Sequence, residues 1–311
     1  MSTTLRIRKV AVLGAGVMGA QIAAHLVNAN VDTVLFDLPS KEGDPNGIAN
    51  KAISNLAKLS PAPLALTARA AALTPANYDQ HLDLLRDCDL IIEAIAERID
   101  WKKDLYAKIA PHVAAHAILA TNTSGLSVNV LAEVLPAELH HRFCGVHFFN
   151  PPRYMHLAEL IPCAHTDAVV LDGLEGFLTT TLGKGVVRTK DTPNFIANRV
   201  GTFAMISTFH HTARLGLGLD IVDALTGAAI GRPKSGTYRL GDVVGLDTLG
   251  HVIRTLTTYL PSDPWHPHYQ IPEALARLVE KGALGQKTGA GFYRKQGKDI
   301  LVLDIATGEY R

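Results

Sequence analysis

The chain has 311 residues, of which 30 are basic and 29 acidic, so its formal net charge is +1. A chain of this length, with 47% apolar residues, can bury one large or two ordinary hydrophobic cores, which excludes a disordered protein. Because the charge is almost balanced, the composition provides no overall field for nucleic acid or an anionic membrane, and we expect neither as a partner.

The segment KVAVLGAGVMGAQIAAHL, residues 9–26, predicts a strand that turns directly into a helix. In such a turn one glycine allows the tight bend, one lets the backbone approach a pyrophosphate, and one lets helix and strand pack closely. The glycines here are Gly14, Gly16 and Gly19. A second apolar run ends in Asp37, whose carboxylate can accept hydrogen bonds from an adenosine ribose. This order of elements, in which a strand, the glycines, a helix, a second strand and an acid follow one another, predicts a dinucleotide site.

The same segment has no charged side chain from Val10 to Val31 and follows a basic start, as a signal peptide or a membrane span would. The glycines and the polar residues inside it favour the nucleotide turn instead. Three cysteines, none in a CxxC pair, fit reduced thiols buried as small apolar side chains. They are Cys88, Cys144 and Cys163. We therefore expect a cytoplasmic protein.

Residues 39–86 exceed an ordinary crossover between strands and predict a helical excursion. Within it, Lys51 and Lys58 would lie about two helical turns apart and form a local basic strip. On this spacing alone, a solvated surface is the favoured interpretation.

Further buried strands are predicted around Ile91 and Ile92, at residues 117–121 and at residues 143–149, with helical segments between the earlier ones. Shorter strands at 157–161 and 186–189 complete a mostly parallel sheet. Open α/β sheets bind ligands at the carboxyl ends of their strands. Ser124, His147 and Asn150 would lie along that edge.

After Lys190 the pattern becomes helical, with helices predicted at 194–215 and near 220–230, 245–259 and 272–281. We therefore predict an α/β protein, with a Rossmann-type NAD-binding domain at residues 1–190 and a mainly α-helical domain at residues 191–311. The last twelve residues, ILVLDIATGEYR, predict two strand-like runs about a turn, with no clear place in a helical domain. Although the chain has 14 histidines, no HExxH motif or convergent Cys/His spacing occurs, so we expect no metal site.

Seven motifs in chain order resemble those of the L-3-hydroxyacyl-CoA dehydrogenases of fatty-acid β-oxidation. They are VAVLGAGVMG, EAIAE, TNTSGL, GVHFFNPP, DTPNFIANR, DVVGLD and KTGAGFY. The resemblance implies NAD-dependent, reversible oxidation of (S)-3-hydroxyacyl-CoA to 3-oxoacyl-CoA, with acyl-CoA as substrate. We also expect a homodimer. Because similar bacterial proteins continue into an enoyl-CoA hydratase domain, one hypothesis makes this chain part of a longer bifunctional protein.

Matched residue by residue, the active site of that family corresponds to Ser124, His147, Glu159 and Asn198. His147 would act as the base, since imidazole titrates near neutral pH, and Glu159 would hold its other ring nitrogen. The resemblance supports Lys51 and Lys58 as CoA contacts. It implies that the cofactor is contacted by Gly14, Gly16, Val17, Met18, Gly19, Asp37, Glu97, Lys102, Ser124, Asn150 and Lys287.

The sequence also departs from the family pattern. Asn194 stands where many members have glycine, and the segment RPKSGTYRL, residues 232–240, replaces a small and apolar one, which leaves the acyl-chain preference open. Three other functions fit part of this pattern. A dehydrogenase of a non-CoA hydroxy acid such as L-gulonate shares the fold, and a catalytically silent NADH-binding protein would not need the four active-site residues. A β-hydroxyacid dehydrogenase with a lysine acid would not account for HFFNP.

Overall fold

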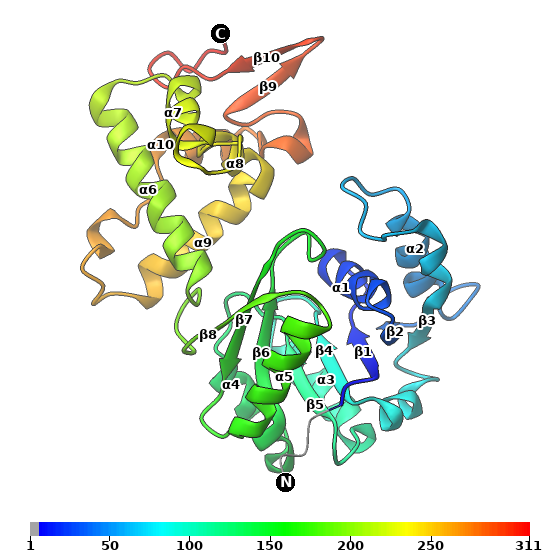
Figure 1. Ribbon diagram of the computed structural model, residues 1–311. Coiled ribbons are helices and arrows are strands. Elements are labelled where there is room, and N and C mark those ends of the chain that lie inside the picture. Colours follow the sequence, from blue (N-terminus) through cyan, green and yellow to red (C-terminus); the bar gives the residue numbers. More distant parts are fainter. Residues whose placement is uncertain (1–5) are drawn as a thin grey trace. The chain divides into compact units, whose positions relative to one another are not determined.

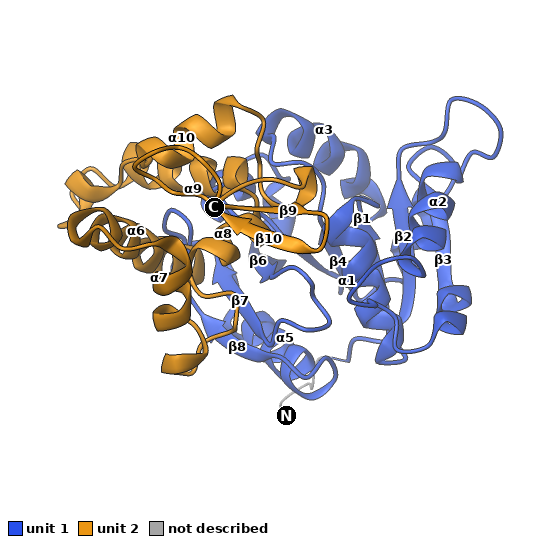
Figure 2. Cartoon of the chain, turned by 90° about the horizontal axis from the view of Figure 1, so that it is seen from above, with its two compact units in different colours: residues 1–195 blue, residues 196–311 orange. Residues whose placement is uncertain are grey.

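The computed structural model describes residues 6–311, and the chain divides into two compact units, residues 1–195 and 196–311 (Figure 2). The division follows Phe195 rather than Lys190, where the sequence pattern changes. Phe195 packs into a core of the first unit. Asp191 accepts hydrogen bonds from the backbone N–H groups of Val128 and Asn129. The segment after the last strand of the sheet is therefore tied to the first unit.

The first unit is built on an eight-stranded sheet (Figure 1). Its strands are β1 (Lys9–Leu13), β2 (Asp32–Asp37), β3 (Leu73–Asn77), β4 (Leu90–Glu93), β5 (Ile118–Thr121), β6 (Phe143–Phe148), β7 (Leu157–Pro162) and β8 (Gly185–Arg188). They lie in the order β3-β2-β1-β4-β5-β6-β7-β8. Strands β1 to β6 are mutually parallel, whereas β7 is antiparallel to β6 and parallel to β8. This mostly parallel sheet confirms the predicted Rossmann-type architecture.

Helices cover both faces of this sheet (Figure 1). They are α1 (Val17–Asn28), α2 (Gly47–Leu56), α3 (Ile99–Ile109), α4 (Val128–Glu133) and α5 (Ala168–Thr180), with short turns η1 (Thr67–Ala72), η2 (Leu82–Asp87), η3 (Ala110–His112) and η4 (Ala137–Arg142). Successive side chains of a strand point to opposite faces. Val10 and Val12 of β1 pack in one core with α1 and α5, and Ala11 and Leu13 pack in another with α3 and α4. This is why the strand sequences are continuously apolar.

The excursion after β2 differs from the expectation in two ways. It contains β3, an edge strand that pairs with β2 and that the sequence analysis did not predict. Pro75 within it obscured the strand, although an edge strand tolerates proline because only one of its sides needs hydrogen bonds. In addition, α2 ends at Leu56, so Lys58 follows the helix that carries Lys51. The two lysines do not share one helical strip as their spacing predicted.

The second unit is mainly helical and has its own core. It comprises α6 (Ala197–Leu215), α7 (Leu219–Thr226), η5 (Ala228–Ile230), α8 (Tyr238–Val244), α9 (Leu246–Tyr259), η6 (His266–His268), α10 (Glu273–Glu280), η7 (Gln286–Thr288), β9 (Tyr293–Gln296) and β10 (Asp299–Val302). Helix α6 begins at Ala197 and not at Asn194 as predicted. The φ angles of Asn194 and Phe195 are 61° and 51°, in the left-handed region that a right-handed helix cannot continue. Asparagine adopts this region more readily than most residues.

The C-terminal segment belongs to this helical unit. β10 pairs with β9 in an antiparallel hairpin, and the chain then returns so that Arg311 and Val302 exchange both backbone hydrogen bonds. Val302 and Leu303 are buried in the core of the unit. Of the two predicted strand-like runs, the first forms β10 and pairs with β9, whereas the second forms no strand and contributes a single bridge between Tyr310 and Leu303.

Residues 10–31, whose lack of charge resembled a targeting segment, form parts of β1 and α1 and the turns around them. Within residues 6–311, no helix combines the length and the apolar character needed to cross a membrane. The three cysteines are buried and free, in agreement with their interpretation as small apolar side chains.

Candidate active site

The three glycines between β1 and α1 have different surroundings. Gly14 has a φ of 104°, and a Cβ atom there would lie 2.9 Å from the carbonyl oxygen of Ala94. A Cβ atom on Gly19 would lie 1.8 Å from the carbonyl oxygen of Gly14, so the helix packs directly on the turn. A Cβ atom on Gly16 would meet nothing within 4 Å. The turn thus has a tight bend, a close helix contact and an open backbone position that a phosphate could approach.

The start of α1 and the end of β2 frame this turn. No side chain caps the first N–H groups of α1, which begins at the exposed Val17 and the half-buried Met18. Free N–H groups at a helix start favour anions. Asp37 accepts hydrogen bonds from the backbone N–H groups of Ala15, at 2.6 Å, and Leu38, at 2.7 Å. Its carboxylate is fixed beside the turn and partly exposed, so these residues fit the adenosine and pyrophosphate of a dinucleotide.

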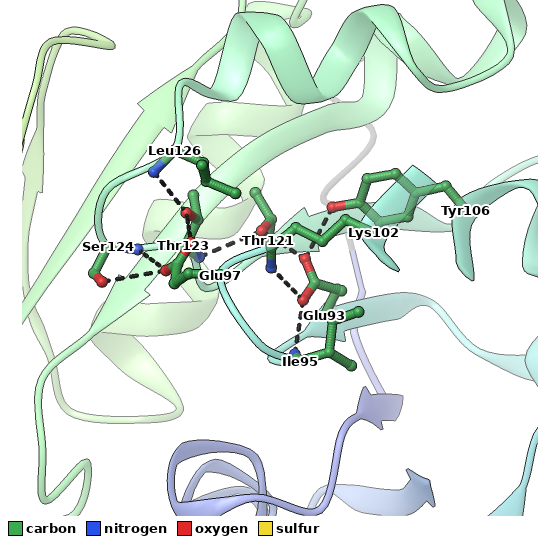
Figure 3. A network of polar contacts seen from close by, with 9 residues as sticks. All are labelled: Glu93, Ile95, Glu97, Lys102, Tyr106, Thr121, Thr123, Ser124 and Leu126. Atoms are coloured by element: carbon green, nitrogen blue, oxygen red, sulfur yellow. Dashed lines mark hydrogen bonds and ion pairs between the residues drawn. The ribbon is translucent and has the colours of Figure 1, made fainter. Parts of the chain in front are cut away.

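Ser124 lies in the loop after β5 and is held by Glu97, which follows β4 (Figure 3). The backbone N–H and the hydroxyl of Ser124 donate to Glu97 Oε1 at 2.6 and 3.2 Å. The hydroxyl of Thr123 donates to Glu97 Oε2 at 2.6 Å. A serine hydroxyl has one hydrogen, and this one points to Glu97. The lone pairs of Ser124 Oγ are therefore available to accept a hydrogen bond.

His147 on β6 and Glu159 on β7 form a buried pair. The two residues are directly opposite in the antiparallel ladder, and His147 Nδ1 lies 2.8 Å from Glu159 Oε2. Glu159 is fully buried and His147 is 4% exposed. The imidazole also contacts the rings of Phe149 and Phe195, with centroids 4.4 and 5.6 Å away. The carboxylate fixes the orientation of the ring, which leaves Nε2 as the nitrogen that can exchange a proton with a substrate.

The loop that carries Ser124 is joined to the end of β6. Asn122, two residues before Ser124, accepts a hydrogen bond at 2.9 Å from the backbone N–H of Phe148, the residue after His147. Beyond β6, exposed Asn150 accepts a hydrogen bond at 3.2 Å from the Gln21 side chain of α1. Within the first unit, these contacts tie together the glycine-rich turn, the Ser124 loop and the His147–Glu159 pair at one edge of the sheet.

The remaining predicted residues are placed differently. Lys51 and Lys58 are exposed in the excursion. Lys102 is fully buried, with its ammonium 2.6 Å from Glu93 Oε1, and so does not reach the surface as a predicted cofactor contact would. Two predicted residues belong to the second unit: Asn198 lies on α6, and Lys287 forms an ion pair of 2.7 Å with Asp247.

Glu93 is the residue whose role the sequence analysis missed. Its fully buried carboxylate at the end of β4 accepts hydrogen bonds from four groups. The donors are the backbone N–H of Ile95, the ammonium of Lys102 and the hydroxyls of Tyr106 and Thr121. The sequence does contain a hint, because an acid that ends a strand buried on both faces needs a partner. No group of three or more His, Cys, Asp or Glu side chains within residues 6–311 could hold a metal ion.

Comparisons with known proteins agree on one family. A family model described as "3-hydroxyacyl-CoA dehydrogenase, NAD binding domain" matches residues 9–192. A second, described as "3-hydroxyacyl-CoA dehydrogenase, C-terminal domain", matches residues 195–295.

Individual relatives extend this result. A Bacillus subtilis protein named "Probable 3-hydroxyacyl-CoA dehydrogenase" is 41% identical over 98% of this chain and 40% of its own length. A Rickettsia felis protein named as a fatty acid oxidation complex trifunctional enzyme is 41% identical over 94% of this chain and 42% of its own length. The chain thus spans about two fifths of these two relatives. The solved structure of (S)-3-hydroxybutyryl-CoA dehydrogenase from Ralstonia eutropha is 30% identical, with a TM-score of 0.76 over 92% of this chain and 98% of that one.

Proposed function

The chain belongs to the 3-hydroxyacyl-CoA dehydrogenase family, and from this membership we propose that it oxidises (S)-3-hydroxyacyl-CoA to 3-oxoacyl-CoA, reversibly and with NAD, in fatty-acid oxidation. The observation that carries the proposal is the buried His147–Glu159 pair at the ligand-binding edge of the sheet. The open backbone at Gly16 and the fixed carboxylate of Asp37 support NAD as the cofactor.

The chemistry assigned to His147 follows from its contacts. Oxidation of a secondary alcohol requires removal of the hydroxyl proton while a hydride leaves the same carbon. NAD, when bound, supplies the hydride acceptor. Because Nδ1 of His147 is engaged by Glu159, we assign Nε2 as the base, and the buried carboxylate stabilises the imidazolium that forms. In the reverse direction the same nitrogen returns the proton to the 3-oxo oxygen.

Ser124 is assigned to the substrate oxygen. Since its hydroxyl hydrogen is donated to Glu97, Ser124 would accept the hydrogen bond of the substrate hydroxyl and thereby hold the alcohol for deprotonation. Asn198 and Lys287 remain in the proposal, as contacts of the substrate oxygen and of the cofactor, because they match the family motifs. Lys102 is not proposed as a direct cofactor contact, because its ammonium forms an ion pair with buried Glu93.

The assembly and the length of the protein are also proposals. Exposed apolar side chains on α7 and α8, among them Ile221, Leu225 and Val243, support a homodimer formed through the second unit. The greater length of two relatives, one of them named trifunctional, supports a covalently linked further domain such as an enoyl-CoA hydratase.

The decisive experiment is the oxidation of NADH, followed by its absorbance, with acetoacetyl-CoA as substrate. We expect saturable activity that disappears when acetoacetate replaces the thioester. Saturable oxidation of L-gulonate by NAD, without activity toward acetoacetyl-CoA, would replace the proposal with a dehydrogenase of non-CoA hydroxy acids. NADH binding with no activity toward either substrate would indicate a catalytically silent protein.

A further inference from the structure

A polar network that is fully buried at its centre extends from α3 to the loop that carries Ser124, where Glu97 is exposed (Figure 3). Its centre is the Glu93 carboxylate. Oε1 accepts hydrogen bonds from Lys102 Nζ at 2.6 Å and from the backbone N–H of Ile95 at 2.7 Å. Oε2 accepts hydrogen bonds from the hydroxyls of Thr121 at 2.8 Å and Tyr106 at 2.9 Å. All three side chains that donate to Glu93 are fully buried, so the carboxylate is held in one orientation by donors from β5 and α3.

Thr121 connects this centre to the loop. Its hydroxyl donates to Glu93 and also accepts a hydrogen bond at 3.3 Å from the backbone N–H of Thr123. The hydroxyl of Thr123 donates in turn to Glu97, which receives both hydrogen bonds from Ser124. The contacts are therefore continuous from the Lys102 ammonium to the Ser124 hydroxyl.

The charges in this network need an explanation beyond stability. Taking an ammonium and a carboxylate out of water is costly, and well-packed apolar residues of similar volume are often at least as stabilising as a buried ion pair. What an apolar pair cannot supply is direction. The Glu93 carboxylate orients the Thr121 hydroxyl so that its lone pairs face the backbone of the loop.

We propose that Glu93 and Lys102 are positioning residues that, through Thr121, hold the Ser124 loop in the conformation required for the dehydrogenase reaction. The inference rests on the proposed function, in which Ser124 contacts the substrate oxygen. It gives Lys102 a role that differs from direct contact with the cofactor. It also predicts that substitutions in the network lower the rate by displacing Ser124 and not by disrupting the fold.

The test interrupts the network at Thr121, because a substitution there leaves both members of the Glu93–Lys102 ion pair in place. Thr121→Val keeps the side-chain shape but loses the hydroxyl, whereas Thr121→Ser keeps the hydroxyl. With acetoacetyl-CoA and NADH, we expect Thr121→Val to lower kcat about 10- to 100-fold, since small misplacements of reacting groups cost this much. Thr121→Ser should recover most of the rate.

A double-mutant cycle then separates positioning from general damage. In a Ser124→Ala background, Thr121→Val should have almost no further effect, because the group that it positions is already gone. The double variant Glu93→Gln/Lys102→Met removes both charges together. It should also lower kcat when Ser124 is present and have almost no further effect in the Ser124→Ala background. Equal losses of kcat in the presence and absence of Ser124, or a wild-type rate in Thr121→Val, would overturn the proposal.

A readout without catalysis keeps this inference distinct from the proposed function. Amide hydrogen exchange at Thr123 and Ser124 should be faster in Thr121→Val than in the wild type and nearly normal in Thr121→Ser, while exchange in β1 and α1 is unchanged. Unaltered exchange at Thr123 and Ser124 would refute the positioning role even if the wild-type protein proved inactive toward acyl-CoA. An inactive wild type with the expected exchange pattern would instead refute only the proposed function.

Discussion

His147 and Glu159 are twelve residues apart in the chain, yet His147 Nδ1 lies 2.8 Å from Glu159 Oε2. They meet because β7 returns antiparallel to β6, which places the two residues directly opposite each other in the ladder. A cross-strand pair of this kind is set by the register of two strands, and a slip of β7 by one residue would turn Glu159 to the other face, away from His147. The sheet itself therefore orients the imidazole.

The first prediction is that His147 and Glu159 act as one acid–base unit. His147→Gln removes the titrating group, so hydride transfer should slow by about 10²- to 10⁴-fold while NADH still binds. Glu159→Gln should also slow it, because an amide can contact the ring but cannot stabilise the imidazolium by charge. The measurement is single-turnover NADH oxidation by both single variants and the double variant.

The double variant provides the check on that pair. Residues that act as a unit lose far less together than the product of their separate losses. Strictly multiplicative losses, or a His147→Gln protein of normal rate, would show that the pair has been assigned wrongly. Folding and NADH affinity of each variant are the controls.

The second prediction is a preference for NAD over NADP that depends on Asp37. A phosphate on the adenosine ribose would meet this carboxylate at close range, at a cost of about 1 to 4 kcal/mol between water-like and surface-like dielectric. Asp37→Asn should therefore raise the kcat/KM for NADPH relative to that for NADH. Equal efficiency of the wild-type protein with both cofactors would contradict the role of Asp37.

The third prediction concerns Lys51 and Lys58. If they bind the phosphates of CoA, their removal should raise the Michaelis constant for acetoacetyl-CoA and weaken its salt dependence with kcat nearly unchanged. Because Lys58 lies beyond the end of α2, the two single alanine variants should differ in their effects. Lys41→Ala, at another exposed position, is the matched control. Kinetics like those of the control would mark both lysines as ordinary surface residues.

The fourth prediction concerns Lys184, a buried lysine that contacts the loop between β6 and β7. Its ammonium donates hydrogen bonds to the carbonyl oxygens of Pro152 and Met155. Lys184→Met would leave the buried carbonyl of Pro152 without this donor, at a cost of about 1 to 3 kcal/mol, and the part-buried carbonyl of Met155 would lose its contact as well. Denaturant unfolding at pH 7 should therefore show a clear loss of stability, whereas Lys190→Met, at an exposed site, should show almost none.

The same lysine predicts a pH dependence of stability. Burial lowers the pKa of Lys184 to about 8, from a usual value of 10.5. Between these pH values the unfolded chain binds the proton and the native protein does not, so the contribution of Lys184 to stability rises with pH. The difference in unfolding free energy between the wild type and Lys184→Met should thus be larger at pH 10 than at pH 7. A difference that shrinks over this interval would contradict the assignment.

Much of the first unit could be predicted from the sequence because its evidence is local. The apolar run before Gly14, the helical period after Gly19 and the acid at Asp37 are encoded within about thirty residues, and a strand–glycine–helix turn has few alternatives. The strand ends at Ser124 and His147 could be found in the same way.

What only the tertiary structure decided depends on contacts between distant segments. Strand β3 forms because β2 offers an edge for it, against the weak propensity of its own residues. Helix α2 ends before Lys58, so a spacing that is regular in the sequence does not become a shared helical strip. Lys102 lies on a helix, as the sequence pattern suggested, but its ammonium forms an ion pair with Glu93 on β4. A charged group that packing buries is stable only when an opposite charge lies beside it. Local pattern specifies which elements form, whereas the register and packing between them determine which side chains meet.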